Sequence, residues 1–190
     1  MEKLLLVGAG GFGRVVLEHA SREYECAFVD DGYELGSEIC GAKVIGKFSD
    51  IASLYPEYRL LSVTIGNTGL REKIYNRSQE IGYEFPNIIG PNVYISPYAT
   101  VGSGCVILNN VTVQNGSKVG NGVILNHGVE IHHDSKVDDF SLIYTNSVIR
   151  TYAKVGKRVK IGSNVSISNE AIIADDCVVD DGAVITKDWR

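Results

Sequence analysis

Two different periods of apolar positions divide the chain near residue 90. Before that point, the apolar runs Leu4–Val7, Glu25–Asp30 and Ser62–Ile65 have the length of short buried strands. The segment Leu70–Ile81 has the spacing of an amphipathic helix. Strands that alternate with helices are typical of a small α/β domain with a parallel sheet, here of about four strands. We expect this domain to occupy residues 1–88.

After that point, an aliphatic residue recurs at every sixth position. Sixteen such anchors follow in unbroken phase from Ile95 to Ile185, and the residue two places before each is small or compact, as at Ala99 and Ser117. Neither a helix nor a simple strand has this period. A repeat of six predicts a parallel β-helix in which three hexads, about 18 residues, close one triangular coil and stacked coils share a core. The spacing does not determine the handedness of the coil.

Composition and charge exclude several classes of protein. With 18 basic and 23 acidic residues the net charge is −5, so we expect neither nucleic-acid binding nor attachment to a membrane surface. No apolar run is long enough to predict membrane insertion, and no cleavable signal pattern opens the chain, which favours the cytoplasm. The cysteines are scattered without metal-like spacing and are expected to be reduced thiols. They are Cys26, Cys40, Cys105 and Cys177.

Three of the four histidines fall within one expected coil: His127, His132 and His133. An imidazole on a turn can be an exposed polar side chain without a role in catalysis. It can also be a general base, because its unperturbed pKa lies near 6.5. Because His127 and His133 are six residues apart, they also suggest a zinc site of three histidines on such a helix. The only other histidine is His19, in the first domain, so a third ligand is missing and we expect no metal.

A glycine-rich turn, Gly8–Gly13, joins the first strand to a helix, and Asp30 follows at the end of the second strand. This context satisfies the dinucleotide-binding fingerprint, in which backbone amides at a helix N-terminus meet phosphate. About 85 residues are too few for the two halves of a complete dinucleotide fold. The turn therefore predicts either binding of a nucleotide part of a substrate or a vestigial structural turn.

Several hexads pair the anchor with glycine, as at Val101-Gly102, Val119-Gly120 and Ile161-Gly162. In this the chain resembles the left-handed β-helix acyltransferases. With the N-terminal glycine turn added, the chain resembles one subfamily of these enzymes, the sugar acetyltransferases. This subfamily includes sialic-acid O-acetyltransferases and nucleotide-amino-sugar N-acetyltransferases. The resemblance implies a small α/β Rossmann-like domain over residues 1–88 that binds the acceptor. It also implies a left-handed parallel β-helix of hexapeptide repeats over residues 89–190, the domain that would catalyse acyl transfer.

The resemblance also implies roles for individual residues. His133 would be the general base and Asp134 its carboxylate partner, with His132 and His127 as alternatives. Asn126 would orient the nucleophile, although a structural turn residue is an equal reading. The nucleotide-linked sugar acceptor would contact Gly8, Gly10, Gly11, Phe12, Asp30, Asp31, Gly66 and Asn67. Acetyl-CoA would lie between prisms of a homotrimer and contact Thr151, Ser163 and Asp181.

We expect the reaction to be N-acetylation of a nucleotide-linked amino sugar, with O-acetylation of a sialic-acid-type sugar as the alternative. Thr151-Tyr152 on the donor coil and the C-terminal segment Thr186–Arg190 depart from the family pattern. These departures leave open a second class of function, a non-catalytic scaffold that keeps affinity for nucleotide sugars.

Overall fold

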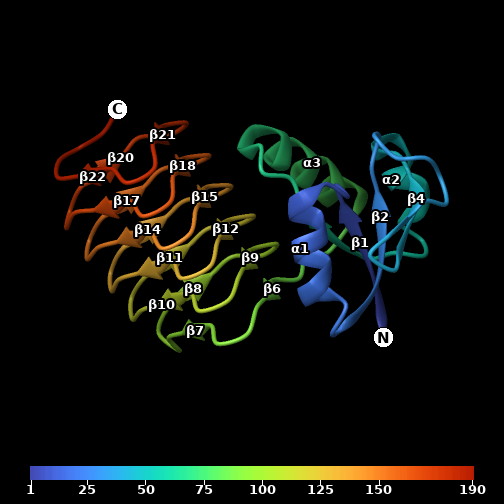
Figure 1. Cartoon of the computed structure of the whole chain (residues 1–190), viewed down its shortest axis with the longest axis horizontal. Helices are drawn as coiled ribbons and strands as arrows, with labels where there is room; N and C mark the ends of the chain where they lie inside the picture. The colour runs from blue at the N-terminus through green and yellow to red at the C-terminus, as the bar shows by residue number, and fades with distance from the viewer. The chain divides into compact units, whose positions relative to one another are not determined.

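The computed structural model describes residues 1–190, and the chain divides into two compact units, residues 1–88 and 89–190 (Figure 1). The first unit mixes helices with a sheet, and the second consists of short strands joined by turns. None of the helices has the length and apolar content that crossing a bilayer requires.

The sheet of the first unit has five strands in the order β3-β4-β2-β1-β5. Their bounds are β1 Glu2–Val7, β2 Tyr24–Val29, β3 Glu38–Ile39, β4 Ala42–Gly46 and β5 Leu60–Val63. The central strand β1 pairs in parallel with β2 and β5, and β2 pairs in parallel with β4. Leu4, Leu5, Leu6 and Val7 are fully buried, as expected for a central strand covered on both faces. The carboxyl ends of these parallel strands therefore share one edge of the sheet.

The structure differs from the predicted sheet in the bounds of one strand and in one additional strand. The strand expected at Ser62–Ile65 lies at Leu60–Val63, and just beyond it the Thr64 N–H donates to the carbonyl oxygen of Val7 at 3.0 Å while the Thr64 hydroxyl donates to that of Gly8 at 2.6 Å. The expected four parallel strands are β1, β2, β4 and β5, and the sequence did not predict the additional short strand β3, which pairs antiparallel with β4. That short hairpin alternates exposed and buried positions and has no continuous apolar run to reveal it.

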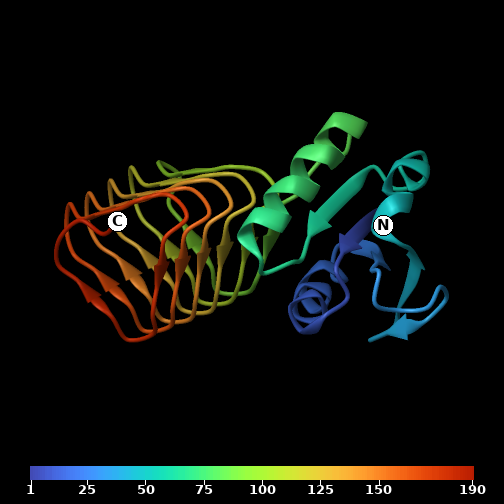
Figure 2. The same cartoon turned by 90° about the horizontal axis from the view of Figure 1, so that it is seen from above.

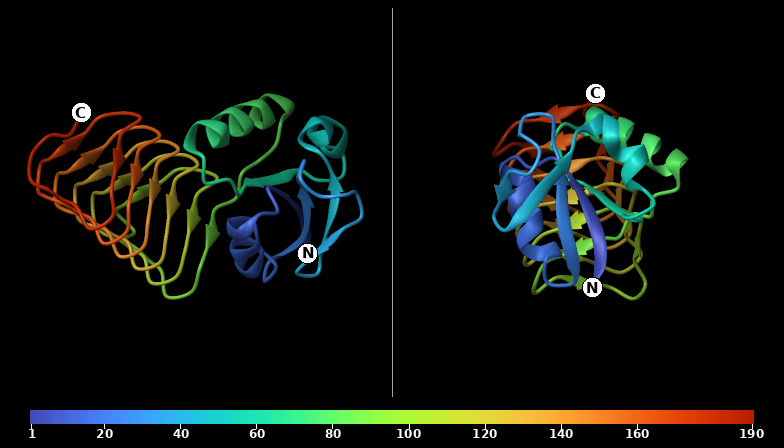
Figure 3. Two further views of the ribbon diagram at one scale, coloured as in Figure 1. Left: turned by 45° about the horizontal axis from the view of Figure 1, so that its top comes forward. Right: turned by 90° about the vertical axis from the view of Figure 1, so that its right-hand side faces the viewer.

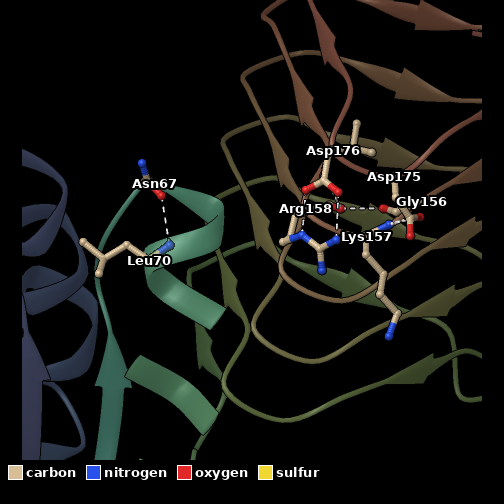
Figure 4. Close-up of polar contacts among 9 residues, drawn as sticks. Asn67, Leu70, Gly156, Lys157, Arg158, Asp175 and Asp176 are labelled. Carbon is tan, nitrogen blue, oxygen red and sulfur yellow. Dashed lines mark hydrogen bonds and ion pairs between the residues drawn. The ribbon is translucent and has the colours of Figure 1, made fainter. Parts of the chain in front are cut away.

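The helices of the first unit are α1 Gly11–Ala20, the 3₁₀ turn η1 Phe48–Asp50, α2 Ile51–Leu54 and α3 Thr68–Ile81. The helix α3 begins two residues before the predicted Leu70, because the side chain of Asn67 caps it: Oδ1 accepts the Leu70 N–H at 2.9 Å (Figure 4). It ends at Gly82, whose φ of 112° is the left-handed C-cap conformation that glycine adopts without strain.

The second unit is a parallel β-helix with three faces, as the hexads predict (Figures 2 and 3). Face 1 contains β6 Ile88–Ile89, β9 Val106–Ile107, β12 Ile124–Leu125, β15 Leu142–Ile143, β18 Lys160–Ile161 and β21 Val178–Val179. Face 2 contains β7 Tyr94–Ile95, β10 Thr112–Val113, β13 Glu130–Ile131, β16 Val148–Ile149, β19 Ser166–Ile167 and β22 Val184–Ile185. Face 3 contains β8 Thr100–Val101, β11 Lys118–Val119, β14 Lys136–Val137, β17 Lys154–Val155 and β20 Ile172–Ile173.

Each strand pairs with the strand 18 residues further along the chain, as Val113 pairs with Ile131. The anchors from Ile107 to Ile185 are at most 4% exposed and form one continuous core. Only the first two anchors, Ile95 and Val101, are partly exposed. The predicted period and phase of the repeat are confirmed. Each coil buries its apolar side chains against those of the coils before and after it.

The turns between faces follow one backbone pattern. The third residue after each anchor, from Asn92 to Gly182, has a positive φ, with Tyr98 as the exception. Inside the corners, hydroxyls replace longer side chains: Ser141 and Ser147 each donate to a glycine carbonyl oxygen at 2.7 Å. We name the turns corner 1–2, corner 2–3 and corner 3–1 after the faces they join.

Candidate active site

His133 lies at corner 2–3, in the turn that follows β13. The anchor Ile131 and the compact Ser135 both point into the core and are buried, so the residues between them project outward. The side chain of His133 is 50% exposed and that of Asp134 is 46% exposed. The turn therefore presents an imidazole to solvent on a rigid scaffold.

Both ring nitrogens of His133 are hydrogen-bonded. Nδ1 lies 2.9 Å from Oδ2 of Asp134, and Nε2 lies 3.1 Å from Oγ1 of Thr151, one coil further on. The backbone N–H of His133 donates to Oε1 of Gln114 at 3.1 Å, which fixes the turn to the coil before it. A carboxylate at Nδ1 requires a proton there, so this network leaves the Nε2 lone pair for proton abstraction. The sequence left open whether Asp134 reaches the ring, and the structure shows that it does.

The conformation of Asp134 depends on its neighbours in the turn and in the preceding coil. Its φ of 59° turns the carboxylate back toward the ring, and its N–H donates to the carbonyl oxygen of Asn115 at 3.0 Å. Gly116 lies 18 residues before Asp134, and a Cβ there would overlap Oδ1 of Asp134. The absence of a side chain at Gly116 makes room for the carboxylate.

The other two histidines of this region have different surroundings. Nε2 of His132 lies 3.2 Å from Oε2 of Glu130, on the same turn as His133. His127 lies at corner 1–2 and makes no side-chain hydrogen bond. Among the three, only His133 has a carboxylate on one ring nitrogen and a hydroxyl on the other.

The remaining residues predicted in the second unit fall on two corners. Thr151 shares corner 2–3 with His133. Asn126, Ser163 and Asp181 lie at corner 1–2, where the Ser163 N–H donates to Oδ1 of Asp181 at 2.6 Å. Ser163 and Asp181 also line a cavity of about 250 Å³. Within one chain, Asn126 is therefore not brought to His133.

The predicted glycine turn lies at the carboxyl edge of the first sheet, between β1 and α1. Gly8 has a φ of 108°, and a Cβ on Gly13 would overlap the carbonyl oxygen of Gly8, so both positions require glycine. Gly10 and Gly11 differ, because a Cβ at Gly10 would meet nothing and one at Gly11 only the end of the Arg14 side chain. The first amides of α1 have no acceptor within the helix, and the half-buried Phe12 lies among them. This open backbone can approach an anionic group closely.

The carboxylates of Asp30 and Asp31 accept hydrogen bonds from backbone N–H groups at this edge of the sheet. Oδ2 of Asp30 accepts the Ala9 N–H and Oδ1 accepts the Gly32 N–H, both at 2.7 Å. Oδ1 of Asp31 accepts the Phe48 N–H at 2.9 Å. Both carboxylates thus shape the loops at the end of β2, a role that sequence reasoning missed.

Gly66 and Asn67 follow β5 at the same edge of the sheet. Asn67 uses its side-chain oxygen as the cap of α3 (Figure 4). Arg71 is only 1% exposed, and its guanidinium donates to the carbonyl oxygen of Ile65 at 2.8 Å. This buried hydrogen bond fixes the loop between β5 and α3. The sequence contained a signal for Arg71, since it shares the buried helix face of Ile74 and Tyr75.

Corner 3–1 holds no predicted site residue, and an ion pair and a backbone hydrogen bond join its successive coils. Nε of Arg158 lies 2.6 Å from Oδ1 of Asp176, and the Lys157 N–H donates to Oδ1 of Asp175 at 2.8 Å (Figure 4). The hydrogen bond from Arg158 lowers the pKa of Asp176 below its ordinary value. No group of three or more His, Cys, Asp or Glu side chains is arranged to hold a metal ion.

An α/β unit followed by a left-handed prism of hexapeptide coils is the architecture expected from the resemblance to the hexapeptide-repeat acetyltransferases. Residues 3–78 match the model of the PglD N-terminal domain, and residues 89–188 match that of the GMPPB C-terminal domain. The chain belongs to the PglD-type hexapeptide-repeat N-acetyltransferase family, and the resemblance stated from sequence is confirmed.

Solved structures support the assignment over the whole chain. The acetyltransferase domain of PglB from Neisseria gonorrhoeae, in complex with acetyl coenzyme A, is 32% identical, with a TM-score of 0.93 over 99% of this chain and 92% of that one. A His-to-Asn mutant of perosamine N-acetyltransferase from Caulobacter crescentus, in complex with CoA and GDP-perosamine, is 25% identical. Its TM-score is 0.95 over 100% of this chain and 90% of that one.

Proposed function

We propose that the protein transfers the acetyl group of acetyl-CoA to the amino group of a nucleotide-linked amino sugar, with His133 as the general base. The observation that carries the assignment of the base is the imidazole held by Asp134 at Nδ1 and directed outward through Nε2. The relatives with bound CoA or acetyl coenzyme A support the donor, and the relative with GDP-perosamine supports the acceptor class.

In the proposed reaction, the nitrogen of the acceptor amine attacks the thioester carbonyl carbon of acetyl-CoA. Nε2 of His133 removes a proton from that amine as the attack proceeds. A C–N bond forms, the C–S bond breaks, and CoA leaves as a thiolate that takes up a proton. Asp134 stabilises the imidazolium that forms, and backbone amides stabilise the oxyanion of the tetrahedral intermediate. Asn126 would orient the amine.

For the acceptor, we propose that the diphosphate lies on the turn Gly8–Gly13. The open positions Gly10 and Gly11 and the amides that begin α1 support this placement. The backbone of Phe12 would contribute one of these amides. Asp30 would hold the turn through the Ala9 N–H, and both Asp30 and Asp31 would meet the ribose or base with their remaining lone pairs. Gly66-Asn67 would border the same site.

For the donor, we propose that acetyl-CoA contacts Thr151, Ser163 and Asp181 in a homotrimer. Because Thr151 belongs to corner 2–3 and the other two to corner 1–2, one prism cannot enclose the donor with all three. A site between the corner 2–3 of one protomer and the corner 1–2 of its neighbour uses all of them. No metal takes part in this mechanism, and a cytoplasmic location stays a prediction.

The test is release of CoA from acetyl-CoA with a panel of UDP- and GDP-linked amino sugars. His133→Gln keeps the hydrogen-bonding shape but removes the base, so we expect kcat to fall about 10²- to 10⁴-fold. His132→Gln changes the neighbouring ring and should retain activity. A folded wild-type protein that releases no CoA with any acceptor contradicts the function, and an active His133→Gln contradicts the base.

A further inference from the structure

Thr151 contacts the nitrogen of His133 that the proposed reaction needs. Its Oγ1 lies 3.1 Å from Nε2, at the opposite edge of the ring from Asp134. In the neutral imidazole the Asp134 carboxylate requires the proton on Nδ1, so Nε2 is the acceptor and the Thr151 hydroxyl is the donor. The imidazole is thus held in its own plane from both sides.

The chain contains an internal comparison for this contact. His127 and Thr145 occupy the same hexad positions as His133 and Thr151, one hexad earlier and also 18 residues apart. No hydrogen bond joins the side chains of His127 and Thr145. The residue that follows His127 is Gly128, whereas Asp134 follows His133. The fold alone therefore does not produce the contact, and the three side chains act as a set.

Tyr152 adds a contact against the ring itself. Its ring lies edge-to-face with the imidazole at a centroid distance of 6.0 Å and an interplanar angle of 82°. Its φ of 61° places a bulky residue in the left-handed region, which costs free energy unless surrounding structure holds it there. The turn that carries Thr151 is therefore itself fixed against His133.

We propose that Thr151 is a positioning residue, which holds the ring of His133 in place through a hydrogen bond to the unprotonated Nε2 until the acceptor amine replaces its hydroxyl. The amine must donate to the same lone pair before its proton can be transferred. Rotation of the threonine about Cα–Cβ frees that lone pair without movement of the backbone. The kinetic consequence rests on the proposed function, whereas the hydrogen bond at Nε2 is a property of the free protein.

The tautomer is measured directly by long-range ¹H–¹⁵N correlation NMR on protein labelled with ¹⁵N-histidine, at alkaline pH. Four histidines give few signals, and single His→Gln variants assign them. We expect His133 to be the Nδ1–H tautomer in the wild type and in Thr151→Val, because Asp134 fixes it. Thr151→Val keeps the shape and removes the donor, so the Nε2 resonance of His133 should move downfield, toward that of a nitrogen without a hydrogen bond. Thr151→Ser should restore the wild-type spectrum. Thr145→Val, the same change at the equivalent position, should leave His133 unaffected.

Kinetics provide a second readout. Thr151→Val should lower kcat roughly three- to tenfold, the effect of one ordinary hydrogen bond, beyond any change in the KM for acetyl-CoA, and Thr151→Ser should recover most of kcat. An unchanged Nε2 resonance of His133 in Thr151→Val overturns the proposal, as does a raised KM for acetyl-CoA with normal kcat, which would assign Thr151 to the donor alone. If no acetyl transfer occurs, the proposed function fails and the NMR result still decides the role of Thr151.

Discussion

At the scale of single residues, the base depends on atoms in three successive coils. Asp134 reaches the imidazole because its turn position has a positive φ, and Gly116 in the preceding coil leaves space for the carboxylate. Thr151 in the following coil completes the set. A change in any of these coils can therefore disturb the base without touching His133.

Gly116→Ala tests this dependence. The new Cβ would overlap Oδ1 of Asp134 and displace the carboxylate from Nδ1, so we expect a lower kcat with little change in KM. Gly182→Ala is the matched control: its φ of 72° is close to the 71° of Gly116, but a Cβ there meets nothing within 4 Å. Both variants should lose about 1–2 kcal/mol of stability from backbone strain alone. Equal kcat values for the two would show that Asp134 is not displaced.

The sequence predicted part of this constellation. The hexad phase placed His133 and Asp134 together on an outward turn, because side chains between two buried positions must face away from the core. It did not predict that Asp134 folds back, since this depends on a φ and a rotamer that Gly116 permits. Thr151 was predicted only as a donor contact, although its spacing of 18 residues from His133 already placed it in the adjacent coil.

At the scale of elements, the anchors support the turns from within. Each strand contributes only two residues, so its stability comes from neighbours in the coils before and after it. β13, which leads into the His133 turn, pairs with β10 on one side and β16 on the other. β22, in contrast, is the last strand of face 2.

Ile131→Ala and Ile185→Ala compare these two situations. Ile131 is fully buried between two coils, so truncation should cost about 2–5 kcal/mol in the free energy of unfolding. Ile185 packs at the end of its face, and its truncation should cost clearly less. Chemical denaturation of both variants measures the difference, and equal losses would contradict stabilisation by neighbouring coils.

The sequence predicted the elements of the two units unequally. The hexads of the second unit gave every anchor its place, because one period repeats without interruption from Ile95 to Ile185. In the first unit the β3–β4 hairpin was missed and β5 was displaced by two residues. The bounds of these strands depend on contacts made across the sheet, such as that of Thr64 with Gly8. The strands are also too short for a repeating pattern of apolar residues to show in the sequence.

At the scale of the whole molecule, the proposed site residues occupy two corners of the prism. His133 and Thr151 share one corner, while Asn126, Ser163 and Asp181 share another, and no single chain brings the two groups together. The hexad phase already implies this separation, because Asn126 and His133 follow the successive anchors Leu125 and Ile131 and so belong to different corners. Assembly of protomers would resolve it.

Mixing two inactive variants tests the shared site. His133→Gln and Asn126→Ala should each have low activity, and co-expression should restore activity in mixed trimers. Random association leaves both wild-type residues in about one quarter of the shared sites, so about a quarter of wild-type activity is expected. Mixed protein no more active than its parents would contradict the shared site, and a fully active Asn126→Ala would remove Asn126 from it.

The 18-residue coil also limits how a gene for such a protein can lengthen or shorten. Loss or gain of a few residues between Ile131 and Ile149 would shift every later side chain to a different corner and move Thr151 away from His133. Loss or gain of one complete coil beyond Thr151 would keep all remaining residues in phase. Natural variants of this architecture should therefore differ by whole coils, with odd insertions confined to loops that bulge from a turn.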